Sequence, residues 1–370
     1  MKDIAEKSLF IIPEKIKRLL WSFIILGIGM FIAGLMTGGK DSELRIWQAF
    51  LINTVFWAGI AHAGIFFSVI WQLTDAKWGR PFKRLAEACA GFLPISFLMF
   101  VIVFFGSNVL YEWTHNPFLH HGIAVKAGWL NMPFFVSRNI AWLILIYAVS
   151  WWFVKTSIKP DIALARKLLG TDWGGKFADK MLDGYGEHED EVIRLEKLSR
   201  KIAPALAILY AFGGSFLAWD FLMTLDQEWF STLFGWYLLA SMLVSGITVI
   251  ALITIYLKSK GHLDVVNDSH LHDLAKFMFG FSIFWTYLWF SQFMLIWYAN
   301  IPEEVTYFME RIELSNYRFL FWFSAAINFV VPTIILMSRD AKRNTNFLIV
   351  ASVVILIGHW INSYLLFAPG

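Results

Sequence analysis

The sequence predicts an all-α polytopic membrane protein with nine to ten transmembrane helices. Hydrophobic residues make up 58% of the 370 residues and charged residues only 16%, so a soluble fold would leave too much apolar surface in water. The 19 tryptophans and 36 phenylalanines are an excess typical of helices that meet lipid headgroups. Helices also satisfy every backbone N–H and C=O group within lipid.

Nine apolar segments of roughly 17 to 30 residues have the length that a bilayer core demands. They predict a single integral membrane domain over residues 1–370, and we expect the short fourth segment to begin earlier, near Pro133. The predicted spans are Leu19–Met36, Trp47–Leu73, Leu85–Trp113, Asn139–Val154, Ile202–Leu225, Ser231–Leu257, Leu274–Tyr298, Phe319–Met337 and Asn346–Phe367.

Lysine and arginine gather in alternate connections, which predicts a cytoplasmic N-terminus. With that orientation, the inside segments hold 24 of the 31 lysines and arginines and the outside segments six. The longest inside connection, residues 155–201, alternates acidic and basic residues. It predicts a solvated amphipathic helix at the membrane surface, with a docking surface for a partner subunit as the alternative. The chain stops outside at Gly370, directly after an apolar helix, and we expect a missing tenth span.

Ionisable groups within membrane spans are costly, so each is a functional candidate. His62 lies near the middle of the second span, where a histidine can hydrogen-bond a quinone, relay a proton or bind haem; an interhelical hydrogen bond is the structural alternative. His359 lies in the middle-to-outer part of the ninth span and could equally be a satisfied core histidine. Asp220, near the outer end of the fifth span, suits a desolvated proton acceptor. Its structural alternative is a partner such as Gln292 or a tryptophan N–H.

Two charged pairs are expected at the inner face. Asp273 and Lys276 are three residues apart and share a helical face, and Arg84 and Glu87 have the same spacing at the same depth. An ion pair near the headgroups is one interpretation of Asp273 and Lys276. A cytoplasmic proton entry that joins both pairs is the alternative.

The outer loop after the seventh span holds Glu303 and follows a polar helix face that includes Gln292. Acidic residues there would release protons, with capping and solvation as the alternative. The candidate groups together predict two proton half-paths. These groups are Arg84, Glu87, Asp273 and Lys276 at the inner face, His62 at the centre, and Asp220, Gln292, His359 and Glu303 at the outer face.

The single cysteine, Cys89, excludes an internal disulfide, a CxxC zinc site, a thiolate-held cluster and a CxxCH haem attachment within this chain. We therefore expect no cofactor ligands of its own, and no sequence signature predicts nucleic-acid binding. Two other classes stay open. A haem-b membrane anchor needs paired histidines on facing helices, and a secondary transporter often has an inverted repeat with broken helices.

Four stretches resemble the F subunit of bacterial alternative complex III, a quinol:electron-acceptor oxidoreductase, within the wider NrfD/PsrC-like family of membrane subunits. The third and fourth stretches are long and specific, and the resemblance spans nearly the whole chain. The stretches are the His62 region to Pro81, Trp129–Phe135 with Arg138, Asp220–Gly235, and His272–Lys276 continuing to Asn300–Glu304.

This resemblance implies two four-helix bundles with flanking helices in a bacterial inner membrane. It implies as partners a paralogous NrfD-like membrane subunit, a periplasmic iron–sulfur and molybdopterin-like subunit, c-type cytochromes and a terminal oxidase, besides lipids. Haem c and iron–sulfur clusters would lie in those partners. The implied activity is the oxidation of quinol, such as menaquinol, coupled to proton movement, with a quinone pocket in this chain left open.

Overall fold

The computed structural model describes residues 12–115, 124–170, 172–226, 229–313 and 315–367, and over these residues it contains helices and no strands. Within this part of the chain, nine helical segments are long and apolar enough to cross a bilayer, which confirms the predicted fold class. They are α2 (Glu14–Thr37), α3 (Lys40–Leu73), the η1–α4–η2–α5 run (Lys77–Phe105), α7 (Met132–Leu169), α9–η5–η6 (His188–Leu225), α10 (Phe234–Ser259), α11 (Asp268–Ala299), α13–η7–α14 (Ser315–Leu336) and α15 (Thr345–Phe367).

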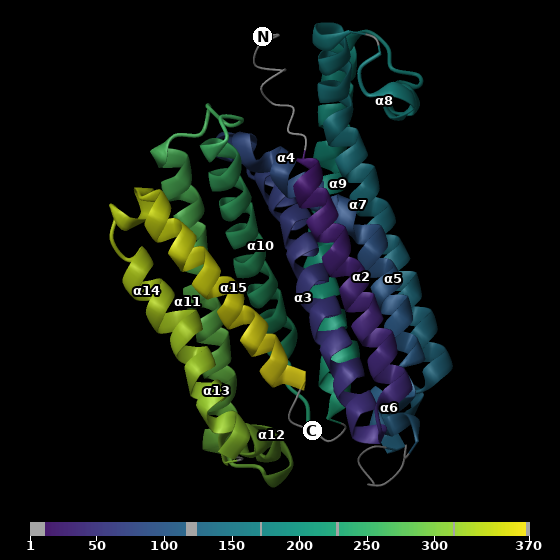
Figure 1. The fold of residues 1–370 in the computed structure, drawn as a ribbon, viewed down its shortest axis with the longest axis vertical. Helices are drawn as coiled ribbons and strands as arrows, with labels where there is room; N and C mark the ends of the chain where they lie inside the picture. The colour runs from purple at the N-terminus through teal and green to yellow at the C-terminus, as the bar shows by residue number, and fades with distance from the viewer. Residues whose placement is uncertain (1–11, 116–123, 171, 227–228, 314, 368–370) are drawn as a thin grey trace.

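Eight of these segments pack as two four-helix bundles, as the resemblance implies (Figure 1). The first bundle contains α3, α4–α5, α7 and α9, and the second contains α10, α11, α13–α14 and α15. Helix α10 packs on both α3 and α9 and joins the two bundles. The polar clusters described below therefore belong to two separate helix sets.

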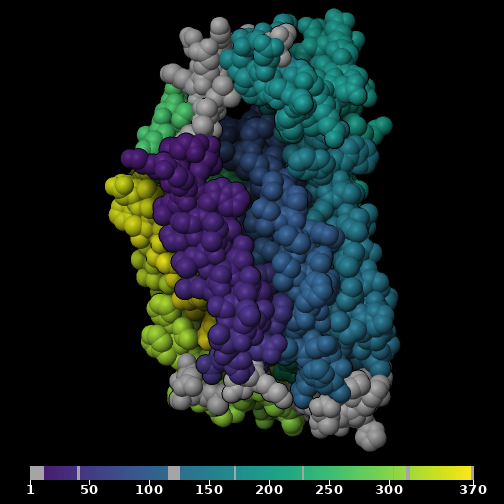
Figure 2. Space-filling view, turned by 45° about the vertical axis from the view of Figure 1, so that its right-hand side comes forward, coloured from purple at the N-terminus to yellow at the C-terminus, as the bar shows by residue number. Residues whose placement is uncertain are grey.

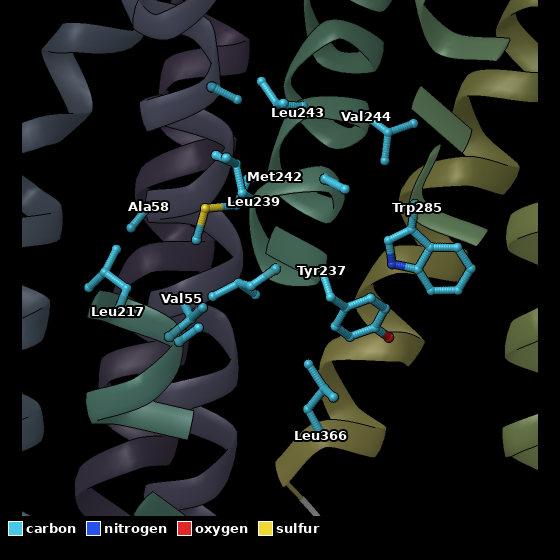
Figure 3. Close-up of a cluster of buried hydrophobic side chains, with 14 of the residues drawn as sticks. Val55, Ala58, Leu217, Tyr237, Leu239, Met242, Leu243, Val244, Trp285 and Leu366 are labelled. Carbon is cyan, nitrogen blue, oxygen red and sulfur yellow. The ribbon is translucent and has the colours of Figure 1, made fainter. Parts of the chain in front are cut away.

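Close approach of α3 and α10 depends on small residues. A Cβ at Gly246 of α10 would clash with the Ala63 side chain of α3, and one at Gly59 of α3 would lie 2.7 Å from Met242. Val55, Ala58 and Met242 fill the space between these helices (Figure 3). Small residues are the usual means by which membrane helices approach each other.

Helix α2 flanks the bundles and contributes no buried residue to the core. It lies across the face of the molecule beside α4–α5 and the C-terminal helices (Figure 2). Its apolar side chains, such as Trp21 and Ile25, are more than half exposed. Such a surface suits lipid or another membrane helix.

The two ends of the helix array differ in charge. We call the end that holds residues 74–79, 172–187, 260–267 and 337–344 the basic end, and the end that holds residues 38–39 and 229–233 the opposite end. At the basic end, α7 and α9 project beyond the other helices and carry the short helix α8 (Gly175–Leu182) between them (Figure 1).

The prediction of a helix lying on the membrane surface over residues 155–201 is wrong. Helix α7 continues through Pro160 to Leu169, and α9 already begins at His188. At 38 residues, α7 is about 57 Å long, well beyond a hydrocarbon core of about 30 Å. Most charged residues of this connection therefore lie on two upright helix extensions, and Lys176, Asp179 and Lys180 lie on α8.

Candidate functional site

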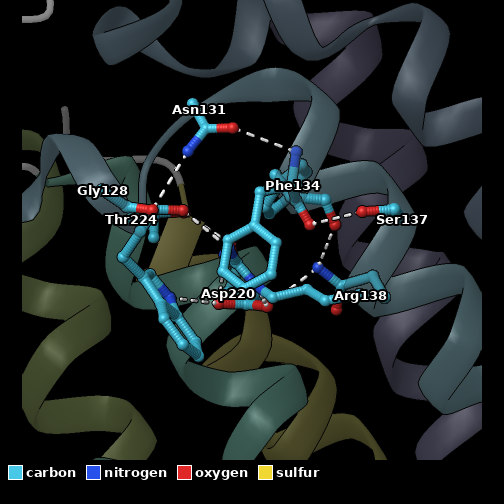
Figure 4. Close-up of polar contacts among 10 residues, drawn as sticks. Gly128, Asn131, Phe134, Ser137, Arg138, Asp220 and Thr224 are labelled. Carbon is cyan, nitrogen blue, oxygen red and sulfur yellow. Dashed lines mark hydrogen bonds and ion pairs between the residues drawn. The ribbon is translucent and has the colours of Figure 1, made fainter.

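The most complete polar site surrounds Asp220 near the opposite end of the first bundle (Figure 4). Its carboxylate is buried and makes a two-point contact with Arg138, with Nε 2.8 Å from Oδ2 and Nη2 2.9 Å from Oδ1. Trp129 donates its indole N–H to Oδ1 at 3.1 Å, and Asn139 donates to Oδ2 at 2.8 Å. Each carboxylate oxygen thus accepts two hydrogen bonds.

The Arg138 side chain has several further contacts besides Asp220. Its guanidinium donates to the backbone carbonyl of Trp129 at 2.6 Å and lies 4.1 Å from the centre of the Trp129 ring. Only 12% of its side chain is exposed. A buried arginine in a two-point pair is fixed in direction as well as charge. The tryptophan alternative for Asp220 is therefore confirmed, whereas Gln292 is not its partner and the carboxylate is not left unpaired.

Local backbone features place these groups. Helix α7 begins sharply because the Asn131 side chain accepts the backbone N–H of Phe134 at 3.1 Å and Pro133 occupies the first turn. Arg138 and Asn139 therefore lie in its second turn. Opposite them, residues Ala218–Leu222 form a π-helical turn that contains Asp220. Such turns often occur at functional sites because they redirect one side chain.

The second cluster surrounds His62 in the middle of the same bundle. Nε2 of His62 lies 3.0 Å from the Tyr147 hydroxyl, which also lies 2.8 Å from the Ser96 hydroxyl. Tyr210, whose ring packs against His62, pairs with Ser150 at 2.7 Å. The structural alternative for His62, an interhelical hydrogen bond, is confirmed, and hydroxyl groups capable of relaying a proton extend from it.

The third cluster lies at the basic end of the first bundle. Glu87 is buried; it pairs with Arg84 and accepts a hydrogen bond of 2.9 Å from Ser68. Arg84 also contacts the exposed Asp161 at 2.6 Å. A cavity of about 400 Å³ adjoins Arg84 and Asp161 and is lined by charged and polar side chains from α3, α4, α7 and α9. Water in this cavity can reach the Arg84 side of the pair.

These three clusters share one bundle at three depths. Ser68 and His62 are six residues apart on α3, about 9 Å along the axis. Tyr147 and Asn139 are eight residues apart on α7, about 12 Å. The interval near Asn139 is filled by buried apolar side chains, among them Phe100, Leu143 and Leu217.

Asp273 and Lys276 form the expected ion pair at the basic end of the second bundle, at 2.7 Å. Burial and then the charge of Lys276 lower the pKa of Lys342, which lies in the adjoining connection. Asp273 contacts Lys276 and His272, whereas Arg84 and Glu87 contact α3 and α7. Among the described residues, no ion pair or hydrogen bond joins the two inner pairs.

His359 and Gln292 belong to the second bundle. Nδ1 of His359 lies 2.9 Å from the Ser241 hydroxyl, and its ring packs edge-on against Trp285. Gln292 is buried and lines a small cavity with Tyr237, Asn362 and Arg311. Glu303 lies in the first turn of α12 (Pro302–Glu313), and its side chain is outside the described part of the chain.

The two deep histidines do not face each other. Met242 of α10 lines the small cavity at His62, whereas the adjacent Ser241 bonds His359. Helix α10 therefore separates the two imidazoles, and they cannot ligate one haem from opposite sides. The described residues also contain no group of three or more metal-binding side chains.

The sequence did not identify several side chains of these clusters as site residues. Arg138 appears there only within a stretch that carries the resemblance, and nothing in the sequence predicts its ion pair with Asp220. Tyr147, Ser96 and Tyr210 carry no charge, so hydropathy does not single them out. Their importance follows only from contacts between helices far apart in the chain.

The fold and its buried polar clusters define a polytopic helical membrane protein with ionisable groups at several depths. A family model described as "Polysulphide reductase, NrfD" matches residues 172–370, more than half of the chain. The chain therefore belongs to the NrfD family, whose members are membrane subunits of redox complexes. A search of curated proteins found no match.

Proposed function

We propose that this chain is the F-type membrane subunit of an alternative complex III, a respiratory quinol:electron-acceptor oxidoreductase, and that it moves protons across the bacterial inner membrane. Membership of the NrfD family supports its place in a redox complex. Iron–sulfur and molybdopterin-type subunits, typical partners in this family, and c-type cytochromes would carry the electrons. The basic end would face the cytoplasm.

The observation that carries the proton role is the stack of polar clusters in the first bundle. Glu87 pairs with Arg84 beside the polar cavity at the basic end, and the His62–Tyr147–Ser96 cluster offers groups that can both donate and accept a proton. Asp220 lies at the other end of the bundle. The apolar interval between Tyr147 and Asn139 would prevent a continuous leak, so transfer across it must be coupled to a change in the complex.

Asp273 and Lys276 have a different place in this proposal. Their ion pair lies in the second bundle with a further cation, Lys342, beside it. We assign them to the stability of the basic end. The predicted entry then contains Arg84 and Glu87 alone.

The proposal can be tested with Asp220→Asn in the complete complex reconstituted into vesicles, alone and together with Arg138→Gln, since the double variant leaves no uncompensated buried charge. Electron transfer from quinol should continue, because this chain holds no electron carrier in the proposal, while proton release per electron falls. Asp273→Asn serves as the control and should leave the ratio unchanged. An unchanged ratio in both variants would overturn the proton role.

A quinone pocket is the second candidate function. A cavity of about 160 Å³ adjoins the Asp220 site, and aromatic side chains of Trp129, Trp219, Trp229 and Phe230 line it. Flat aromatic walls with a few polar groups suit a quinone ring. A photoreactive quinone analogue should then label this cavity. Loss of that labelling in Trp219→Ala, with labelling retained in the control Trp57→Ala at a half-exposed side chain, would support the pocket.

The remaining alternatives make different predictions. A secondary transporter would take up substrate as the isolated subunit, whereas our proposal requires that the chain co-purify with multihaem and iron–sulfur subunits. A haem-b anchor would give the purified chain a Soret band. The separation of His62 and His359 by α10 argues against that alternative.

A further inference from the structure

A second set of buried polar groups lies in the bundle that the proposed path does not use. Helix α15 carries Ser352, His359 and Asn362, spaced by seven and three residues and therefore on one face. All three are at least 97% buried. On α10, the buried Tyr237, Ser241 and Ser245 follow at intervals of four.

Two contacts fix how these faces meet. Tyr237 donates a hydrogen bond to Oδ1 of Asn362, and Ser241 pairs with His359 at 2.9 Å. Because α10 and α15 run in opposite directions through the bilayer, Ser245 then lies one turn from His359 toward the basic end. Trp285 of α11 lies against Tyr237 (Figure 3) and also contacts His359. Ser282, one turn before Trp285, therefore lies at the same level as Ser245.

A π-helical turn supplies the fourth side. Residues Ala326–Val330 form this turn, and its Asn328 is fully buried. Oδ1 of Asn328 lies so close to Gly358 that a Cβ there would clash. Asn328 therefore faces α15 next to His359. We call Ser245, Ser282, Asn328, Ser352, His359 and Asn362 the polar seam.

Each member of the polar seam has a buried polar atom without a protein partner among the described residues. These atoms are Oγ of Ser245, Ser282 and Ser352, Oδ1 of Asn328, Nε2 of His359 and Nδ2 of Asn362. An unpaired polar atom in a bilayer interior is costly, because no water replaces the missing hydrogen bond. Six in one bundle would be hard to tolerate unless something polar bonds to them.

Space for that partner exists at one end of the seam. A cavity beside Asn362 is lined by Tyr237, Gln292 and Ser324 and offers about 30 Å³ to the centre of a water molecule. One water needs about 10–15 Å³ by this measure. The donors and acceptors of the polar seam itself are neutral and mixed, which suits water better than an ion. The charged group at the cavity, the Arg311 guanidinium, already donates to the Leu365 carbonyl at 3.0 Å.

We propose that the polar seam binds a chain of internal water molecules, which connects His359 to the cavity at Gln292 and gives the second bundle its own proton route to the opposite end. The route rests on the proposed proton function, whereas the hydration rests on the unpaired atoms alone. A proton would pass by donation from each water to the next, with His359 Nε2 and the seam hydroxyls as acceptors and donors. No net charge then remains on the seam.

Hydroxyl-radical footprinting by pulsed X-rays tests the hydration without turnover, because radicals formed from trapped water oxidise the side chains beside it. In the intact complex, Tyr237 and Trp285 should be oxidised severalfold faster than Tyr111. Tyr111 is also buried, but lies in an aromatic cluster with Trp113 and Phe135. Equal, slow oxidation of Tyr237 and Tyr111 would overturn the proposal.

Two variants locate the water. Asn362→Leu should reduce oxidation of Tyr237, and the milder Ser245→Ala should reduce that of Trp285. Thr254→Val in α10 is the matched control, because its hydroxyl already bonds the Ile250 carbonyl. Undiminished oxidation in both seam variants would contradict the seam as the binding site.

Proton release in the reconstituted complex then tests the route. Asn362→Leu should lower the protons released per electron while electron transfer continues. If Asn362→Leu reduces the oxidation of Tyr237 but leaves the protons released per electron unchanged, the proton route is overturned. The two proposals can fail separately. If Asp220→Asn lowers the protons released per electron but Tyr237 is oxidised slowly, the proposed function stands and the hydrated seam is refuted.

Discussion

Arg138 of α7 and Asp220 of the π-helical turn after α9 meet in a buried two-point ion pair, at 2.8 and 2.9 Å. This pair ties the start of one span to the end of another, 82 residues later. With Trp129 and Asn139 added, the carboxylate has no free lone-pair direction. The site therefore ties two spans together through a buried, fully hydrogen-bonded carboxylate.

Arg138→Gln should destabilise the protein severely. Removing one partner of a buried pair leaves the other charge uncompensated, which costs about 3–5 kcal/mol. The double variant Arg138→Gln/Asp220→Asn should recover part of that loss, because no buried charge remains. Thermal unfolding in detergent measures both. A double variant as unstable as the sum of the two single ones would contradict the pairing.

Tyr147→Phe should have a much smaller effect on stability. It removes the hydroxyl that bridges His62 and Ser96, and interhelical hydrogen bonds in membranes contribute about 0.6 kcal/mol on average and up to about 1.7. Its main effect should be on proton transfer. Tyr298→Phe, on a residue 85% exposed, is the control. A stability loss as large as that of Arg138→Gln would show that the hydroxyl is mainly structural.

Gly246→Ala should separate the two bundles. The new methyl group would clash with Ala63 of α3, and overpacking of this kind costs about 1–3 kcal/mol. Gly27→Ala in α2 meets nothing within 4 Å and should be neutral or slightly stabilising, because alanine favours helix. Cross-linking yield between cysteines on α3 and α10, together with the unfolding temperature, would report the change. Equal effects of the two substitutions would count against the packing.

The sequence predicted the spans well because each depends on local hydropathy and length. The early start of α7 at Met132 was also foreseen from Pro133. The extensions of α7 and α9 beyond the other helices were not predicted. Their residues are as polar as those of a surface helix, and only the unbroken continuation of each span shows that they are upright extensions. Of the predicted partners of Asp220, the tryptophan N–H is correct and Gln292 is not. The π-helical turn that directs Asp220 toward Arg138 has no signature in the local sequence.

The grouping of the candidate residues was harder to predict. Depth along a span can be read from residue number, so Arg84 with Glu87 and Asp273 with Lys276 were each placed correctly as pairs. The division between bundles depends on helix packing, and it separates His62 from His359 and the two inner pairs from each other. Neutral groups such as Tyr147 and Ser241 complete the clusters, and no charge marks them.

Proton release per electron with Glu87→Gln in the reconstituted complex tests the central claim most directly. Glu87 is the one buried carboxylate in the described part of the chain at the basic end of the first bundle. The variant should transfer electrons from quinol while releasing fewer protons, and Asp161→Asn, at the exposed partner of Arg84, should release the normal number. A normal number of protons from Glu87→Gln would contradict a proton path through this bundle.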